Sequence, residues 1–222
     1  MRTAIDSSLH WYGDIFSLHD ILTAVEAGLW WAQGPPPRWH SAAKTIEPTT
    51  SKERALRAVE PFDHCSIADS FGVLDLSDVG FEILLSATWL HHPPLARTTG
   101  VMPRGWSVIQ DQHELEAWNA EHDTADVLLP LLLTHQRFNF LARQVDGSLV
   151  AGAVLHDWGG AAVGMSNAWA VAGTALDPEA ILQCASILHP DRALVDFAHG
   201  TDLDTLIDAG FDQLGPQIVW AR

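Results

Sequence analysis

Apolar residues recur along the chain at two different spacings, and these spacings predict the order of helices and strands. Residues 17–31 have a helical spacing, with Ser17 as a suitable N-cap and the GPPPR segment as a stop; the apolar stripe consists of Ile21, Leu22, Val25 and Leu29. A second helix is predicted over residues 50–62, where Thr50 and Glu53 have the spacing of a capping box and a proline follows.

The second half of the chain alternates strands with helices. Two strand-like runs flank Asp146-Gly147, a dipeptide that favours a type I′ hairpin turn, and this is the clearest local signal in the sequence. Residues 93–103 are rich in Pro, Gly and Thr, which predicts a linker. The other predicted elements are strands at residues 64–71, 81–90, 106–109, 161–170, 193–199 and 216–222, and helices at residues 111–122, 177–189 and 202–211.

The helix predicted at residues 177–189 begins with three residues that each suit their position. Asp177 suits the N-cap, Pro178 suits the first helical position, and Glu179 complements the positive end of the helix dipole. The same residues are poor partners for a phosphate. The Asp177 carboxylate would occupy N–H donors, Pro178 has no N–H, and Glu179 adds a like charge.

Two segments in different halves of the chain resemble one another. Residues 77–90, SDVGFEILLSATWL, and residues 207–221, IDAGFDQLGPQIVWA, share an Asp, then Gly-Phe, then a strand that carries Trp. Gly80 and Gly210 are each expected to end a short helix at its C′ position. We therefore predict two related β-α-β endings, whose closing strands complete a shared or adjacent pair of sheets.

Composition narrows the classes of function. The 222 residues carry a formal net charge of −16, which disfavours nucleic acid and anionic membranes and attracts a cationic or amine-bearing partner. Cys65 and Cys184 stand alone, so we expect reduced core residues in a cytoplasmic protein. The segments VLLPLLL and MRTAIDSSLHWYGD are too short and too polar, respectively, for a membrane span or a signal peptide.

The segments VDGSLVAGAVL and DLDTLIDAGFDQLGPQIVWAR resemble the central hairpin and the closing part of the GNAT acyltransferase family. The resemblance covers about residues 104–222, and residues 1–92 resemble only the closing part of such a domain. It implies an α/β (α+β) fold: a GNAT-like mixed sheet flanked by helices, with an N-terminal partial GNAT-like copy. The expected division is an N-terminal region at 1–92, a linker at 93–103 and a C-terminal domain at 104–222.

The resemblance also implies transfer of an acetyl or acyl group from CoA to a small amine. In the family, a loop with the pattern Gln/Arg-x-x-Gly-x-Gly/Ala holds the pyrophosphate of acetyl-CoA at a helix start. Here that place reads AWAVAGTALDPEA, with a single glycine, Gly173, so no binding residue carries over from this loop. By analogy, the backbone of Val163, Gly164 and Met165 faces the pantetheine arm.

Three polar residues are candidates for catalysis. Ser166 and Asn167 are expected at an opening of the central strand, where they would bind a carbonyl or orient an acceptor; a β-bulge is the structural alternative. His156, beside a Gly-Gly pair, would take the proton of the attacking amine, and a loop histidine is the alternative. Ser166 followed by Asp191 or Asp196 and then His199 also has the residue order of a serine hydrolase.

No histidine spacing in the sequence suits a metal, and we expect none. Trp30 and Trp31 are adjacent, so one of them is expected at a pocket or an interface, and a homodimer is compatible with this. The sequence leaves open three functions. The first is a diverged N-acyltransferase acting on a small amine, the second is a non-catalytic GNAT-derived module that binds a small molecule or a protein, and the most distant is a serine hydrolase.

Overall fold

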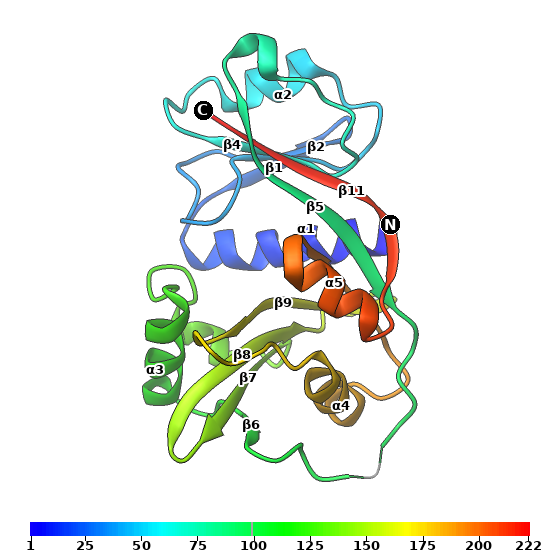
Figure 1. Cartoon of the computed structure of the whole chain (residues 1–222). Coiled ribbons are helices and arrows are strands. Elements are labelled where there is room, and N and C mark those ends of the chain that lie inside the picture. The colour runs from blue at the N-terminus through cyan, green and yellow to red at the C-terminus, as the bar shows by residue number, and fades with distance from the viewer. Residues whose placement is uncertain (99) are drawn as a thin grey trace.

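In the computed structural model, which describes residues 1–98 and 100–222, eleven strands form one mixed sheet (Figure 1). Their order across the sheet is β1-β2-β3-β4-β11-β5-β10-β9-β8-β7-β6. The first half of the chain contributes α1 (Arg2–Leu18), β1 (Thr23–Glu26), β2 (Leu29–Ala32), β3 (Ala43–Thr45), α2 (Lys52–Val59), β4 (Ser66–Asp69), a 3-10 turn η1 (Ser77–Val79) and β5 (Glu82–His92).

The second half follows the order of elements expected from its sequence. It consists of β6 (Trp106–Val108), α3 (Gln112–His122), a 3-10 turn η2 (Pro130–Thr134), β7 (Phe138–Val145), β8 (Ser148–His156), β9 (Ala162–Ala170), α4 (Pro178–Leu188), β10 (Ala193–Ala198), α5 (Gly200–Asp208) and β11 (Asp212–Ala221). Asp146 and Gly147 have φ values of 50° and 79°, the left-handed conformation that a type I′ turn requires, so the predicted hairpin is confirmed.

The helix predicted at residues 17–31 is wrong, because α1 ends at Leu18 and residues 23–32 form a hairpin. Thr23 pairs with Ala32 and Glu26 with Leu29 across a turn at Ala27 and Gly28, both at positive φ. Of the apolar stripe that suggested a helix, Val25 and Leu29 lie in the two strands, whereas Ile21 and Leu22 precede β1. The missed helix, α1, begins at the second residue and buries apolar side chains at helical intervals, namely Ala4, Ile5, Ile15 and Phe16.

The helix at residues 50–62 is confirmed with one shift, since Ser51 rather than Thr50 is its N-cap and accepts a hydrogen bond from the Arg54 N–H. Thr50 instead donates its hydroxyl proton to the carbonyl of Gly28, which lies in the turn of the β1–β2 hairpin. The capping position is therefore decided by a tertiary contact that the local pattern does not contain.

The two repeated segments lie side by side in the middle of the sheet. β5 and β11 pair antiparallel along their length, with Glu82 opposite Ala221 and Asp212 opposite His91. Each strand also borders the other half of the chain, because β11 pairs with β4 and β5 pairs with β10. The halves have exchanged their closing strands. Strands from before and after the predicted linker therefore belong to one continuous sheet.

The glycines of the repeat have the predicted role. Gly80 and Gly210 have φ values of 83° and 96°, and each follows a short helical segment. The next residue donates its N–H five residues back in both copies, from Phe81 to the Leu76 carbonyl and from Phe211 to the Leu206 carbonyl. Both phenylalanines are buried, so each helix end anchors the strand that follows it.

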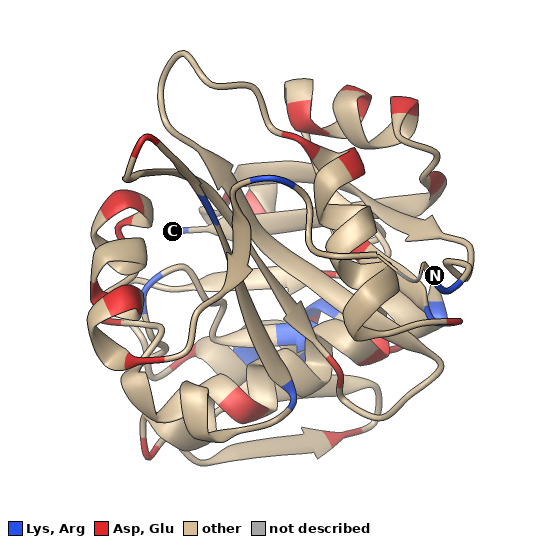
Figure 2. Ribbon diagram, turned by 90° about the horizontal axis from the view of Figure 1, so that it is seen from below, with Lys and Arg blue, Asp and Glu red and all other residues tan. Residues whose placement is uncertain are grey.

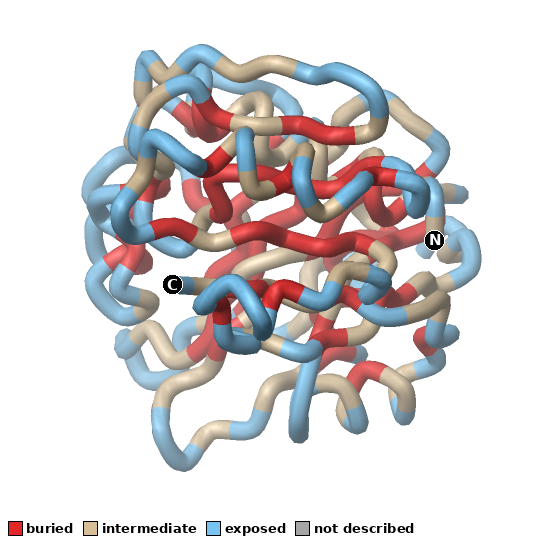
Figure 3. The backbone as a smooth tube through the Cα atoms, turned by 90° about the horizontal axis from the view of Figure 1, so that it is seen from above, coloured by how far each residue is buried: buried red, intermediate tan, exposed pale blue. Residues whose placement is uncertain are grey.

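Helix α1 crosses one face of the sheet at the junction of the halves and packs on β9, β10 and β5 (Figure 1). Helices α4 and α5 lie on the opposite side of β9 and β10, over a core that contains Leu155, Val163, Ile181, Leu194 and Leu206. Burial follows the sheet, and the exposed backbone is concentrated in the turns and loops around it (Figure 3). Among the described residues, no helix combines the length and apolar character needed to cross a bilayer.

The exchange of closing strands predicts that the halves fold together. If the chain is cut by a protease at a site inserted between Val101 and Met102, we expect both pieces to elute together in gel filtration, because β5 and β11 each complete the other half. The uncut chain should unfold in one transition with coincident fluorescence and circular dichroism midpoints. Separation of the pieces without denaturant, or two resolved transitions, would contradict this arrangement.

Candidate functional site

The strands β9 and β10 start as a parallel pair and then separate. Their register is Ala162 with Ala193, Val163 with Leu194 and Gly164 with Val195. Both strands continue beyond that last pair, yet none of the described residues pairs with the β10-facing edge of residues 165–168. The backbone N–H and C=O groups of that edge are therefore available to a ligand.

A β-bulge lies on β9 opposite the opening. Gly152 pairs with Trp169 and Val154 with Ser166, so two residues of β9 face one residue of β8. Asn167 is in the left-handed region with φ 49°, which Asn tolerates better than most residues. Its Nδ2 donates to Ser166 Oγ at 3.1 Å and its Oδ1 lies 3.3 Å from His122 Nε2, so the structural alternative of a bulge is what the fold shows.

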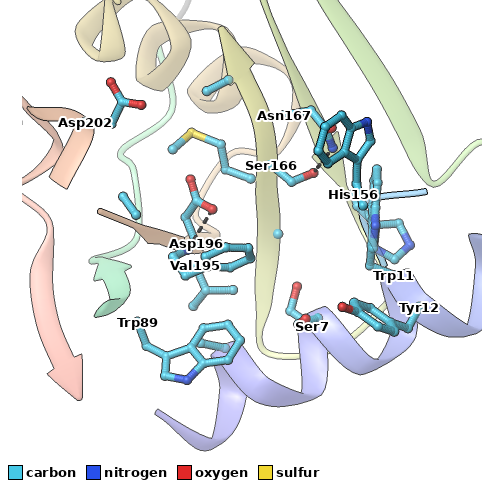
Figure 4. Close-up of a pocket in the computed structure, with 18 of the residues that line it drawn as sticks. Ser7, Trp11, Tyr12, Trp89, His156, Ser166, Asn167, Val195, Asp196 and Asp202 are labelled. Atoms are coloured by element: carbon cyan, nitrogen blue, oxygen red, sulfur yellow. Dashed lines mark hydrogen bonds between the residues drawn. The ribbon is translucent and has the colours of Figure 1, made fainter. Parts of the chain in front are cut away.

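A cavity of about 310 Å³ occupies the space between the separating strands (Figure 4). Its walls include Trp89 and Val195 from the core beneath α1, and Met165, Ala198 and Leu206 from the core beneath α4 and α5. The cavity therefore passes between β9 and β10 from one face of the sheet toward the other. It is reached by side chains of both halves of the chain.

Most of the residues predicted from sequence line this cavity. Gly164, Met165, Ser166, Asn167 and His156 are in its wall. Val163 is not, because its side chain is fully buried in the core under α4 and its backbone is used in the β9–β10 pairing.

His156 is held by a residue of the N-terminal helix. Its Nε2 lies 2.9 Å from Asp14 Oδ2, while its buried Nδ1 has no partner among the described residues. Burial by itself raises the pKa of Asp14, but the hydrogen bond and charge of His156 and the charge of Arg137 outweigh it and lower that pKa. A carboxylate at Nε2 leaves Nδ1 as the nitrogen that accepts a proton or a hydrogen bond.

Asp196 is the other titratable group at the opening. It is the first residue of β10 after the last pair with β9, and its carboxylate points into the space between the strands (Figure 4). Its carboxylate accepts a hydrogen bond from the N–H of Phe197 at 2.7 Å. Surrounding protein, with a further contribution from the charge of Asp202, raises the pKa of Asp196 well above its ordinary value.

The wall on the α1 side is aromatic, which the sequence analysis did not predict. Trp11 and Tyr12 project from α1, Trp89 from β5, and Trp39 from the loop after β2, where it is 69% exposed. The helical spacing of apolar residues in residues 4–16 was the signal that could have placed α1 here. Trp30 and Trp31, which drew attention by adjacency, are buried and half-buried in β2 instead.

The loop that carries Trp39 is fastened to the second half of the chain. Arg38 Nη1 lies 3.0 Å from Asp123 Oδ2, and Arg38 Nη2 lies 2.8 Å from Asp126 Oδ1. His40 lies in the same loop. Its Nε2 accepts a hydrogen bond from the indole N–H of Trp11, and its Nδ1 lies 3.0 Å from the carbonyl oxygen of Arg38. Burial lowers the pKa of His40 to about 4, so this part of the wall is neutral at physiological pH.

The start of α4 is built as the sequence predicts. Asp177 Oδ1 accepts the N–H of Ala180 at 3.1 Å, and Pro178 occupies the first position of the helix. The Ile181 N–H is bonded to the Asp177 carbonyl, so in the described first turn only the Glu179 N–H lacks a partner. A second cavity of about 450 Å³ lies here, lined by Asp177, Glu179, Asp208 and Arg143 among others.

The related opening in the first half of the chain is closed. β3 and β4 form the corresponding parallel pair, with Ala43 opposite Ile67 and Lys44 opposite Ala68. Beyond it, Thr45 donates its hydroxyl proton to Asp69 across the two strands at 3.1 Å. That bond joins the strands at the point where β9 and β10 part, so the halves differ at the place where a ligand would bind.

The serine hydrolase arrangement is not formed. A nucleophile elbow needs a sharp turn from a strand into a helix, but Gly164 to Ala168 lie inside β9. Ser166, Asp196 and His199 do line one cavity, whereas Asp191 lies in the turn before β10 and does not. The described residues also contain no group of three or more His, Cys, Asp or Glu side chains arranged to hold a metal ion.

Solved structures with the same arrangement identify the fold. A GCN5-related N-acetyltransferase from Kribbella flavida aligns over 99% of this chain and 94% of its own, with 14% identity and a TM-score of 0.70. A GCN5-related N-acetyltransferase-like protein from Streptococcus suis covers both chains completely, at 12% identity and a TM-score of 0.59. A putative GNAT-family acetyltransferase from Novosphingobium aromaticivorans covers 95% of each, at 12% and 0.56.

These likenesses show that the chain has the GNAT fold. They extend over nearly all of it, so the N-terminal half, with α1 and the exchanged strand β5, is part of the shared arrangement. No protein-family model matches the sequence, and no curated protein matches it either.

The buried amine of Lys44 gives a test of the wall of the cavity. Its Nζ lies 4.9 Å from the ring centre of Trp89 and 5.2 Å from that of Tyr12, and burial lowers its pKa from 10.5 to about 7. The unfolded chain therefore holds a proton that the folded chain has lost between pH 7 and pH 10.5, and the free energy of unfolding rises with pH across that window.

The variant Lys44→Met should remove the free-energy cost of burying a protonated amine, and this cost is fully present below pH 7. We expect the free energy of unfolding, measured with urea at pH 6, to rise by roughly 2–5 kcal/mol in the variant. This gain should shrink as the pH approaches 10.5. Lys52→Met, at a half-buried lysine that pairs with Asp78, is the control and should show no such gain. A gain that does not change with pH would contradict the buried, neutral amine.

Proposed function

We propose that the protein transfers an acyl group from a pantetheine thioester, with acetyl-CoA as the expected donor, to a small primary amine bound in the cavity. The observation that carries this proposal is the opening between β9 and β10. A strand edge with unused amide groups lies beside a cavity that contains a carboxylate and a histidine. An acyl transfer to nitrogen needs both features, a place that fixes the acyl donor and a group that takes the proton of the amine.

The residues present fit one end of acetyl-CoA and not the other. The pantetheine arm is an extended chain with amide groups, which suits pairing with the free edge of residues 165–168. The diphosphate would meet the start of α4, where Asp177 and Pro178 leave one free N–H and where the carboxylates in the lining outnumber Arg143. The arm is therefore the part by which we expect the donor to be held.

When bound, the thioester supplies an activated acyl carbon, and the residues of this chain supply the rest. We assign Asp196 to hold the protonated amine and to accept its proton, because its carboxylate points into the opening and its raised pKa makes it a stronger base than an ordinary carboxylate. Ser166 already accepts a bond from Asn167, so its own hydroxyl proton is free to donate to a developing negative charge. His156, oriented by Asp14, is the second proton acceptor in the wall.

Asp196→Asn tests the assignment of the base. The amide cannot take a proton, so we expect the rate of acetyl transfer from acetyl-CoA to fall by roughly 10²–10⁴-fold, with retained folding by circular dichroism. The acidic limb of the pH–rate profile should disappear with it. If the loss follows His156→Gln instead, and Asp196→Asn keeps its activity and pH profile, the proton acceptor is His156.

The acidic start of α4 predicts weak binding of acetyl-CoA that can be strengthened. A ligand at 100 times its Kd stabilises a protein by about 2.7 kcal/mol, which a thermal melt detects. We expect a small shift at millimolar acetyl-CoA and a larger one in the double variant Asp177→Asn, Glu179→Gln, since Asn still caps a helix. A reduced shift in that variant would overturn our interpretation of the helix start.

A non-catalytic binding module is the second candidate, and one observation favours it. The helix start that holds the diphosphate in related enzymes of this fold is closed here by its own cap. The absence of any thermal shift with acetyl-CoA, in both the natural chain and the double variant, would establish this alternative. Detectable acetyl transfer to an amine would exclude it.

A further inference from the structure

The lining of the cavity has an unusual combination of charge and surface. Among the described lining residues, the formally charged side chains are carboxylates, Asp196 within and Asp202 at the exposed edge, and none is Lys or Arg. The hydrogen bond that Asp196 accepts comes from a backbone N–H and not from a basic side chain, and burial raises its pKa well above the ordinary value. A bound cation would supply the missing counter-charge.

Five Trp, Tyr and Phe side chains line the same cavity as this carboxylate. Trp11 and Tyr12 come from α1, and Trp39 comes from the loop after β2. The ring centres of Trp89 and Phe197 are 5.5 Å apart, and their ring planes are inclined at 77°. Phe197 is the direct neighbour of Asp196 on β10. Several of these rings are held in place, since the indole of Trp89 donates to the Ser70 carbonyl and that of Trp11 donates to His40. A wall of fixed rings favours a flat apolar body and also attracts cations.

Among the described lining residues there is no lysine or arginine that would pair with a negative charge on the ligand. His40, whose pKa is about 4, is neutral at physiological pH. Lys44 packs against Tyr12 and Trp89 but is not itself in the lining. A carboxylate or phosphate on the ligand would lie near Asp196 without compensation, inside a chain of net charge −16 (Figure 2).

We infer that the acceptor is an apolar monoamine, of the arylalkylamine kind, that carries no carboxylate or phosphate. Its ammonium group lies at Asp196 and its apolar body lies among the rings supplied by α1 and β5. The volume of about 310 Å³ suits a compact molecule of this class and is small for a peptide. This inference rests on the proposed function, because the amine is an acceptor only if acyl transfer takes place. Binding of the amine itself needs no acyl donor.

Binding is measured by titration calorimetry without any CoA, so that it is separate from catalysis. Phenethylamine is the probe; phenylalanine adds a carboxylate to the same body, and phenethyl alcohol removes the charge. We expect phenethylamine to bind at least tenfold more tightly than either. Binding of phenylalanine as tight as that of phenethylamine would overturn the inference.

A pair of charge-matched variants locates the ammonium group. Asp196→Asn should weaken phenethylamine binding tenfold or more and leave phenethyl alcohol unchanged. Asp204→Asn, an equal change of charge at an exposed position of α5 outside the cavity, should leave both unchanged. Asn has nearly the same shape as Asp and carries no charge, so we expect the Asp196→Asn variant to fold. Its melting temperature checks this. Equal effects of the two variants would show that only the overall charge attracts the amine.

The two proposals fail in different ways. If phenethylamine binds at Asp196 but acetyl-CoA gives no transfer, the proposed function is wrong and the inferred ligand class stands. If acetyl-CoA supports transfer to amino acids or phosphorylated amines in preference to phenethylamine, the proposed function stands and the inferred ligand class is wrong.

Discussion

The pairing of β5 with β11 is the constraint on which the rest of the structure depends. Each strand ends one half of the chain and borders the other, so neither half has a complete sheet by itself. This exchange brings α1, at the very start of the chain, onto β9 and β10, which lie far along it. The cavity follows from that placement, because its aromatic wall belongs to the first half and its polar strand edge to the second.

The two halves illustrate how one arrangement can be either closed or open. In the first half, a hydrogen bond from Thr45 to Asp69 joins the parallel strands beyond their last pair. In the second half, the equivalent strands carry Met165 and Asp196 beyond the last pair, and no described bond joins them. The difference lies in side chains that bridge or fail to bridge a gap. A fold built from related endings has thus kept one opening and filled the other.

The energetics of the site run against stability. An uncompensated carboxylate at Asp196, a buried histidine nitrogen at His156 and a buried amine at Lys44 each impose a cost on the folded state. Groups of this kind recur where binding or proton transfer is needed, because a ligand can supply the partner that the protein withholds. The start of α4 shows the opposite arrangement, since its cap and backbone satisfy the N–H groups of Ala180 and Ile181 and leave only that of Glu179 without a described partner.

The sequence by itself determined the local features whose signal lies within a few residues. The Asp146-Gly147 hairpin, the Asp177 cap and the Gly-Phe ends of two helices depend on φ angles and capping atoms that neighbouring residues supply. It also predicted Ser166 and Asn167 at an opening of the central strand and His156 at the end of the hairpin strand, and these residues line one cavity. Only the tertiary structure decided that residues 17–31 form a hairpin and that α1 covers the opening, because both depend on which face of the sheet is left to be buried. Asp196 and Asp14 gained their roles in the same way, from neighbours that are distant in the chain and close in space.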